Sequence, residues 1–316
     1  MAERGVEAVP SSTVEPFGRE IANAARPSPR PSPGGRGSEN APAGECPAGV
    51  DASGSAVWSL CYRELIRFLR QRNRIVGAIG QPVLFWILFG AGLGPSFQLA
   101  GAGTDVSYRE YFFPGTLALI LLFTAIFSTI SIIEDRREGF LQAVLVAPIS
   151  RWSMVLGKVL GGTILATGQG LLFLALGLTV GLHFTIFGVA LAALFSFVVA
   201  FALTSLGFVI AWRMESTQGF HAIMSVFLLP MWLLSGAFFP TDSGWLNWVT
   251  VVNPLTYGVA GLRRLLYVGD AASAAPAWLQ SLPSLPISLM VTFAFALGTF
   301  AVACWIANQR TTGDLL

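Results

Sequence analysis

Two groups of charged residues are spaced so that they could act together on a partner. Arginines recur at steps of four, three and four in the segment 63–74, which places Arg63, Arg67, Arg70 and Arg74 on one helical face. The run Glu134, Asp135, Arg136, Arg137 and Glu138 is followed at once by the apolar segment FLQAVLV. Both patterns indicate charge pairing with a protein or a lipid headgroup, and neither has the spacing of a catalytic site.

Other kinds of chemistry are missing from the sequence. It contains no G-x-x-x-x-G-K-[ST] loop for nucleotide phosphates and no H-E-x-x-H or paired His/Cys cluster for zinc. Cys46, Cys61 and Cys304 lie far apart, and His183 and His221 stand alone. We therefore expect no catalytic residue, no metal site and no cofactor bound by this chain.

The composition requires a membrane around the chain. Hydrophobic residues make up 54% of the 316 residues, and charged residues make up 11%, whereas a soluble domain has roughly 25% charged residues. The mean hydropathy is +0.66. The net charge of +2 is too small to indicate nucleic acid. The sequence predicts a multi-span membrane protein.

Six uncharged runs are long enough to cross the hydrocarbon core, which takes about 20 helical residues. An even number of spans places both termini on one side, and most loop Arg and Lys residues fall on that side. The sequence therefore predicts an all-α integral membrane protein of six transmembrane helices with N-in and C-in topology and no Asp, Glu, Lys or Arg inside a span. The predicted spans are 75–97, 112–133, 159–182, 184–212, 219–239 and 285–307.

Two segments precede the first span. Residues 1–55 are rich in Pro, Gly, Ser and Ala, and we expect this tail to be disordered. Residues 56–74 combine the arginine stripe with a second face that carries Trp58, which predicts an amphipathic helix lying in the cytoplasmic membrane interface. An ordinary solvated helix remains the alternative.

The loop 134–153 is predicted to lie under the membrane on the cytoplasmic side. Its charged start continues the second span, Gly139 permits a bend, residues 140–146 form a short apolar helix, and Pro148 ends that helix. A charged cluster beside an apolar helix is typical of a docking surface. A simple connector at the membrane surface remains the alternative.

The segment 240–284 is predicted to form short external helices that lie along the membrane or re-enter it. Trp245 and Trp248 suit an interface belt. Asn253 and Pro254 mark a break, after which a helix that contains Tyr257 begins.

These segments carry a family resemblance. The order REGFLQAVLVAPISRWSMVLGKVLGG, then LSGAFFP, then NPLTYGVAGLRRLLY resembles the type-two ABC transporter permeases. The resemblance covers about residues 56–310, and we place the six-span permease domain at 75–310. These permeases are the membrane subunits of bacterial drug, lipid and polysaccharide exporters, including daunorubicin-resistance and nodulation-factor exporters. No ATPase motif occurs in the sequence, so the resemblance implies a separate ATPase chain.

The resemblance further implies two permease subunits, here expected as a homodimer among membrane lipids of a bacterial inner (cytoplasmic) membrane. Two copies of an ABC ATPase would bind ATP and Mg and dock on the coupling helix between spans two and three. In this interpretation charge pairs hold the ATPase, while Phe140, Leu141 and Leu145 fill its groove. The predicted coupling residues are Glu134, Arg136, Arg137, Glu138, Phe140, Leu141, Leu145 and Arg151, with Trp58, Arg63, Arg67 and Arg70 on the interfacial helix.

The substrate is expected to be amphipathic, drug-like or lipid-type, because the predicted cavity has no fixed charge. Export of a lipid-linked polysaccharide or lipo-oligosaccharide, ATP-independent transport, and a membrane-embedded enzyme or assembly factor remain alternatives. The candidate cavity residues come from spans two and five. They are Phe123, Thr124, Phe127, Phe227, Met231 and Leu234.

Overall fold

The fold is taken from a computed structural model that describes residues 50–92, 108–179, 185–238, 245–268, 279 and 282–309. The chain divides into Met1–Cys46, which lies outside the described residues, and a unit from Pro47 to Leu316. The described part of this second unit is helical, without a β-strand. This agrees with the all-α class predicted from the sequence.

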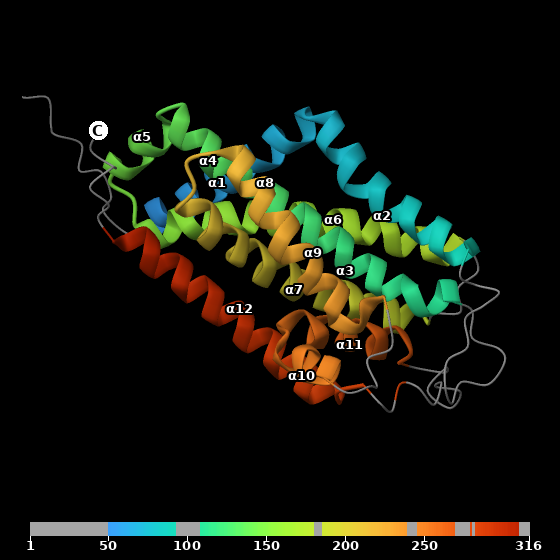
Figure 1. The fold of residues 1–316 in the computed structure, drawn as a ribbon. Coiled ribbons are helices and arrows are strands. Elements are labelled where there is room, and N and C mark those ends of the chain that lie inside the picture. Colours follow the sequence, from blue (N-terminus) through green and yellow to red (C-terminus); the bar gives the residue numbers. More distant parts are fainter. Residues whose placement is uncertain are drawn as a thin grey trace, which may run out of the picture. The chain divides into compact units, whose positions relative to one another are not determined.

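Helices account for nearly all of the described residues (Figure 1). In order they are α1 (Val50–Arg70), α2 (Arg72–Gly92), α3 (Tyr108–Ser128), α4 (Ile130–Arg137), α5 (Phe140–Val146), α6 (Arg151–Thr179), α7 (Ile186–Trp212), α8 (Thr217–Ile223), the π-helical η3 (Met224–Leu228), α9 (Leu229–Trp232), the π-helical η4 (Leu233–Ala237), α10 (Trp245–Val252), α11 (Pro254–Leu266) and α12 (Leu285–Asn308).

Five helical stretches are long and apolar enough to cross a membrane, and they correspond to predicted spans two to six. They are Tyr108–Arg137, Arg151–Leu178, Ile186–Trp212, Thr217–Ala237 and Leu285–Asn308. The first predicted span, 75–97, falls on α2, whose apolar part is the shorter Pro82–Gly92. Residues 93–97 lie outside the described residues. The count of six spans and the N-in, C-in topology stay predictions.

The helices of spans two and three extend past the predicted boundaries. The stretch that corresponds to span two continues through α4 as far as Arg137, and the stretch that corresponds to span three begins at Arg151. Asp135 and Lys158 lie in these extensions, outside the predicted bounds 112–133 and 159–182. Both side chains are buried against opposite charges, with 0% and 5% of their surfaces exposed.

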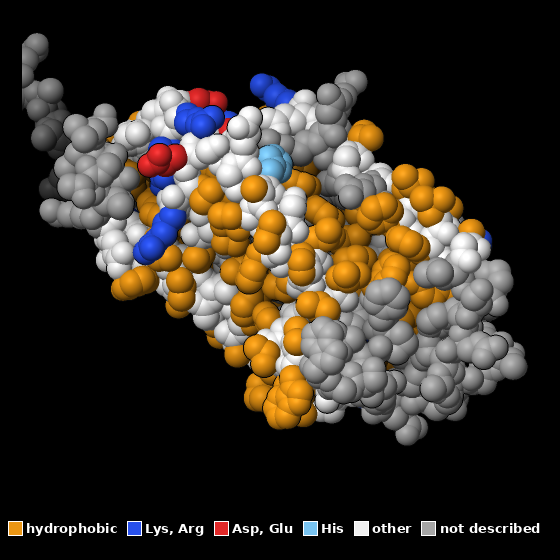
Figure 2. Space-filling model, in the orientation of Figure 1, with side chains coloured by type: hydrophobic (Ala, Val, Ile, Leu, Met, Phe, Trp, Pro, Cys, Tyr) orange, Lys and Arg blue, Asp and Glu red, His pale blue; other side chains and the backbone are white. Residues whose placement is uncertain are grey.

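The helix α3 forms the centre of the bundle, with α2, α6 and α7 packed against it. Its side chains Phe112, Phe113 and Leu117 are fully buried. Phe113 stacks on Phe173 of α6, and both rings contact Trp86 of α2 edge-on. On the face drawn in Figure 2, hydrophobic side chains cover the helices, while most charged side chains gather around α4, α5 and α8.

The helix α1 differs from the predicted interfacial helix in its boundaries. It begins at Val50 rather than at 56 and ends at Arg70, so Arg74 belongs to α2. α1 packs along α6 with Leu60, Cys61 and Phe68 buried. A methyl group on Gly157 would lie 2.9 Å from Leu60 Cβ, and one on Gly161 would lie 2.7 Å from Glu64 Cβ. These two glycines therefore form the groove in which α1 lies.

We predict that Gly161→Ala lowers stability by roughly 1–3 kcal/mol, because the added methyl group overfills the contact between α1 and α6. The measurement is thermal unfolding of the purified protein in detergent. The matched control is Gly168→Ala on the same helix, where nothing lies within 4 Å of the added carbon. Equal melting temperatures for the two variants would contradict the proposed role of this groove.

Candidate functional site

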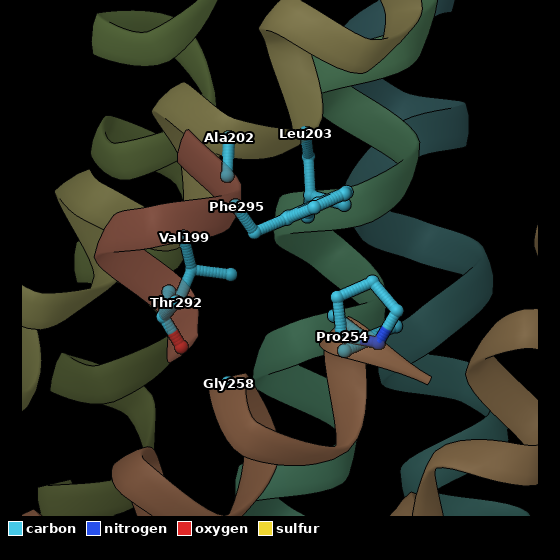
Figure 3. A pocket seen from close by; sticks show the side chains of 8 residues that line it. Val199, Ala202, Leu203, Pro254, Gly258, Thr292 and Phe295 are labelled. Atoms are coloured by element: carbon cyan, nitrogen blue, oxygen red, sulfur yellow. The ribbon is translucent and has the colours of Figure 1, made fainter. Parts of the chain in front are cut away.

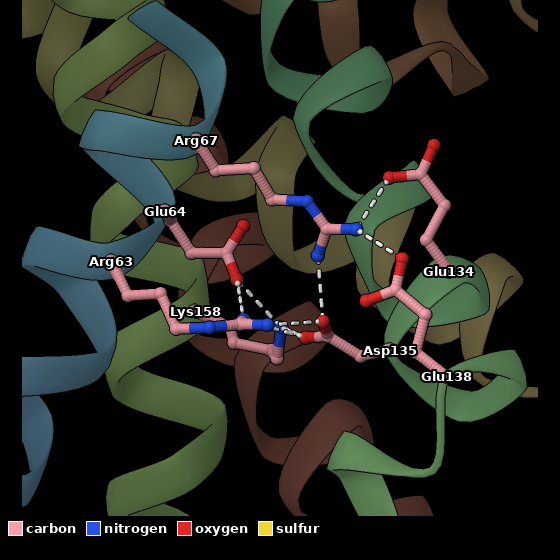
Figure 4. A network of polar contacts seen from close by, with 7 residues as sticks. All are labelled: Arg63, Glu64, Arg67, Glu134, Asp135, Glu138 and Lys158. Atoms are coloured by element: carbon pink, nitrogen blue, oxygen red, sulfur yellow. Dashed lines mark hydrogen bonds and ion pairs between the residues drawn. The ribbon is translucent and has the colours of Figure 1, made fainter. Parts of the chain in front are cut away.

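A buried carboxylate joins three helices at the end of the bundle that carries α5 (Figure 4). Asp135 of α4 is 0% exposed. Arg63 of α1 binds it through two guanidinium nitrogens, at 2.7 and 3.0 Å, and Arg67 donates a further bond at 2.6 Å. Lys158 of α6 donates to its second oxygen. The bond to Asp135 also raises the pKa of Arg63, so Arg63 stays charged.

Three more carboxylates complete this group, which we refer to as the ion cluster. Glu64 of α1, 5% exposed, accepts a hydrogen bond from Lys158 at 2.7 Å. Glu134 lies 3.0 Å and Glu138 3.4 Å from Nη2 of Arg67, at the outer edge. The ion cluster is therefore Arg63, Glu64, Arg67, Glu134, Asp135, Glu138 and Lys158. Buried charges are tolerated when they are paired in this way.

Local sequence explains the placement of these groups. Glu64 follows Leu60 and Cys61 at steps of four and three, so it shares their buried face, while Arg63 and Arg67 lie on the neighbouring face. α4 continues α3 almost without interruption, which carries Asp135 to the level of Lys158. The chain then turns at Gly139, whose φ of 75° favours glycine. This turn directs α5 back beside α1.

The two arginines of the charged run point the other way. Arg136 donates to the carbonyl oxygens of Trp212 and Met214, and its guanidinium lies 5.5 Å from the Trp212 ring. Arg137 donates from Nε to the carbonyl oxygen of Glu215 at 3.1 Å. The five residues 134–138 therefore bind α1 and α6 through carboxylates and the α7–α8 turn through guanidinium groups. Both arginines were predicted to hold a partner. In this structure both bind the chain itself, Arg137 is also exposed, and their contact with a partner stays a prediction.

The apolar side chains of α5 require a similar correction. Leu141 is 1% exposed, so the expectation that it fills a partner's groove is wrong for this structure. Phe140 lies under the Arg63 guanidinium, 3.7 Å from the ring centroid, and Leu145 packs against the core. The exposed positions of α5 and the following bend are Ala143, Val146 and Pro148, with Val146 84% exposed. Burial of Leu141 and the contact of Phe140 with Arg63 fix α5 to the bundle, while Val146 stays exposed.

The remaining predicted coupling residues lie at the margins. Arg151, at the start of α6, donates to the carbonyl oxygen of Ala307 at 2.9 Å and so ties α6 to the end of α12. Arg70 is exposed, and Trp58 is 64% exposed on the outer face of α1 together with Tyr62. These exposed positions leave the interfacial location of α1 as a prediction.

The sequence analysis did not select Glu64, Asp135 or Lys158 as site residues. Signals for two of them were present. Lys158 is the single lysine of the chain. Glu64 interrupts the apolar face of an amphipathic helix, which in a buried helix requires a cation nearby. The partners could not be identified, because Arg63 and Asp135 are 72 positions apart.

The predicted cavity residues are only partly brought together. Phe123 and Phe127 stack with centroids 5.5 Å apart, and Phe127 contacts His221 of α8. Thr124 is 0% exposed and hydrogen-bonds Gln169 of α6, so its hydroxyl lies in a helix contact rather than in a cavity. On span five, Phe227 is 56% exposed. Met231 and Leu234 are half-buried.

A small pocket lies elsewhere, between α7, α11 and α12 (Figure 3). It contains none of the predicted cavity residues, and Thr292 supplies the one hydroxyl in its lining. The lining residues are Val199, Ala202, Leu203, Pro254, Leu255, Gly258, Thr292 and Phe295. Among the described residues, no group of three or more His, Cys, Asp or Glu side chains is arranged to hold a metal ion.

The short helices after span five are present as predicted. α10 begins at Trp245, whose side chain lies outside the described residues, and Trp248 is 78% exposed. Asn253 caps α11 by accepting from the Leu255 amide at 3.0 Å, and Pro254 occupies the first turn. Tyr257 donates to the Val251 carbonyl oxygen at 2.9 Å. The sequence therefore identified the break and the start of the helix, while the capping role of Asn253 comes from the structure.

Comparison with known proteins identifies the family to which this chain belongs. The family model described as "ABC-2 type transporter" matches residues 55–267. The chain belongs to the ABC-2 type transporter family. The match includes α1 from residue 55 onward, the ion cluster, α5 and the helices α10 and α11. As a member of this family, the chain is a membrane permease of the kind that works with an ABC ATPase.

Individual relatives of the chain are also named as transport permeases. The chain is 29% identical over 213 residues to ycf38 of Cyanophora paradoxa, named as a transport permease, covering 65% of this chain and 72% of the relative. It is 27% identical over 229 residues to DrrC of Mycobacterium tuberculosis, named for doxorubicin resistance, covering 67% and 76%. It is 28% identical over 173 residues to YbhR of Escherichia coli, named as a multidrug ABC transporter permease, covering 53% of this chain and under half, 46%, of YbhR.

We predict that Asp135→Asn destabilises the protein by on the order of 3–5 kcal/mol, because it leaves the buried Lys158 and the half-buried Arg63 and Arg67 without the charge of their shared carboxylate. Glu138→Gln removes a carboxylate of the same cluster whose side chain is 61% exposed, so its cost is less than about 1 kcal/mol. Unfolding of both variants by heat in detergent compares them directly. A Glu138→Gln variant as unstable as Asp135→Asn would contradict the role assigned to the buried carboxylate.

Proposed function

We propose that this chain is the six-span permease subunit of an ATP-driven exporter, with both termini in the cytoplasm of a bacterial cell. It works with two copies of a separate ABC ATPase, which bind ATP and Mg, and with a second copy of itself. Its substrate is an amphipathic drug-like or lipid-type molecule. The observation that carries this proposal is the ion cluster, which fastens α4, and with it the adjoining short helix α5, to the long helices α1 and α6.

The proposed mechanism uses the ion cluster as a rigid joint. Closing of the ATPase dimer moves α5, which cannot move alone because Leu141 is buried in the bundle and Phe140 packs under Arg63. Asp135 passes the motion to α1 and α6 through Arg63 and Lys158. The α7–α8 turn follows through the guanidinium groups of the charged run. Movement of α5 by the ATPase would therefore also move α1, α6 and the α7–α8 turn.

The exposed positions on and after α5 fit the role of an ATPase contact. Val146, with Ala143 and Pro148, offers an apolar tip, and the Arg137 and Glu138 side chains lie at the exposed start of the same segment. An apolar anchor surrounded by charge suits a small interface in which one residue carries much of the affinity. The anchor proposed from the structure is therefore Val146 rather than Leu141.

The test is co-purification and transport. The permease is expressed with a candidate ABC ATPase, extracted in mild detergent, and assayed for ATP hydrolysis with and without the permease. Reconstituted vesicles are then supplied with ATP and the amphipathic dye Hoechst 33342 or a fluorescent phospholipid. ATP-dependent movement of either probe supports the proposal. Movement driven by an ion gradient without any ATPase would overturn it.

We predict that Val146→Asp weakens the ATPase complex about 30-fold or more, because it places a charge in an apolar contact worth about 2 kcal/mol. The matched control is Val252→Asp on α10, since Val252 is 80% exposed but lies at the other end of the bundle. Binding is measured by titrating the ATPase against each detergent-purified variant. Equal losses for both variants would contradict docking at α5.

A further inference from the structure

The helix of the fifth span departs from regular α-helical geometry from Met224 to its end at Ala237, and we call this segment the interruption. Two π-helical segments, η3 and η4, flank the single turn α9. Within η4, Gly236 has a φ of 74°, a left-handed conformation that other residues adopt only at a cost. Gly139 is the other glycine with positive φ in the described part of the chain. π-Helical turns inside α-helices are frequent at functional sites.

Side chains from two other helices bind the carbonyl groups of this interruption. Arg263 of α11 donates to the carbonyl oxygen of Ala237 at 3.2 Å, and Tyr111 of α3 donates to that of Gly236 at 3.4 Å. Asn253, before α11, donates to the carbonyl oxygen of Met231 at 2.6 Å. The donors are buried, with Arg263 1% and Tyr111 2% exposed. In a membrane such carbonyl groups need a partner inside the protein.

Close packing brings the interruption against α3. A methyl group on Gly115 would lie 2.5 Å from the carbonyl oxygen of Ala237, so Gly115 is what permits this approach. Trp232 donates from Nε1 to the carbonyl oxygen of Gly115 at 2.8 Å. The Arg263 guanidinium also lies 4.2 Å from the centre of the Tyr111 ring. The bent end of span five is thus held between α3 and α11.

These bonds can be exchanged for bonds to water. If Gly236 adopted the ordinary helical conformation, its carbonyl group would face Pro240, which has no N–H, so the carbonyl groups that Tyr111 and Arg263 now bind would have to be hydrated. Arg263 would then lose the Ala237 carbonyl, and the span would move away from Gly115. A glycine that absorbs a backbone change between two packed arrangements is the usual form of a hinge.

We propose that Gly236 is a hinge in span five and that Arg263 is the positioning residue that latches it in the bent state during the transport cycle. This inference rests on the proposed function only for its ATP dependence. It assigns to α11 the task of holding span five against α3, at the opposite end of the bundle from the ion cluster. Release of the latch exposes the inner side of η4.

The test places a thiol behind the latch. Ser235 is 2% exposed, and Ser235→Cys is introduced after Cys46, Cys61 and Cys304 are replaced by alanine. A membrane-impermeant methanethiosulfonate is added to cells or vesicles, and the labelling rate is measured. We expect slow labelling without nucleotide and labelling about tenfold faster in the vanadate-trapped complex with the ATPase, because local opening sets the rate. An equal labelling rate with and without trapped nucleotide, in a complex that hydrolyses ATP, would overturn the proposed hinge.

Arg263→Met added to Ser235→Cys is expected to give fast labelling even without nucleotide. The matched control is Arg264→Met, since Arg264 binds the carbonyl groups of Leu279, Leu282 and Pro283 instead, and it is expected to label slowly. Slow labelling of the Arg263→Met protein would overturn the latch. Size-exclusion chromatography checks folding.

If Arg263→Met does not fold, Tyr111→Phe makes the same prediction, because it removes one donor and keeps the ring under Arg263. Unchanged slow labelling of Tyr111→Phe would then overturn the latch. Failure of the ATPase to bind at all would overturn the proposed function instead. The labelling rates without nucleotide would still test the latch.

Discussion

The carboxylate of Asp135 is fully buried, and the arrangement of the cytoplasm-facing end proposed here depends on the three cations that surround it. A buried charge costs several kcal/mol unless paired, and removing one partner is far more costly than removing a surface pair. The helices that supply Arg63, Arg67 and Lys158 are therefore not free to separate from α4. This constraint turns a loop between two spans into part of the bundle.

Because of that constraint, the seven-residue helix α5 can transmit force to the long helices of the bundle. α5 is too short to be stable alone, yet its inner side is held by Arg63 over Phe140 and by burial of Leu141. Force applied at Val146 would reach long helices rather than bend a loop. At the other end of the bundle, Arg263 plays the corresponding part, because a buried cation again fixes one element against two others.

Sequence reasoning predicted the features that depend on local rules. Run length gave the helices, Gly139 the turn before α5, and Asn253 with Pro254 the start of α11. Sequence reasoning failed for side chains that could lie either in solvent or against a residue far away in the sequence. Arg136 could equally have faced an ATPase, and only the fold places the Trp212 carbonyl within reach, 76 positions away. The π-helical turns of span five likewise have no local signature beyond Gly236 and Pro230.

The central claim is that α1 and α5 move together because the ion cluster joins them. The most direct measurement is the distance between spin labels on Ser59→Cys of α1 and Ala143→Cys of α5, both exposed positions, in the ATPase complex with and without trapped nucleotide. The account predicts an unchanged distance in the parent protein and a broadened one when Asp135→Asn is added. A shift of about 5 Å, one helical turn, on nucleotide binding in the parent protein would contradict it.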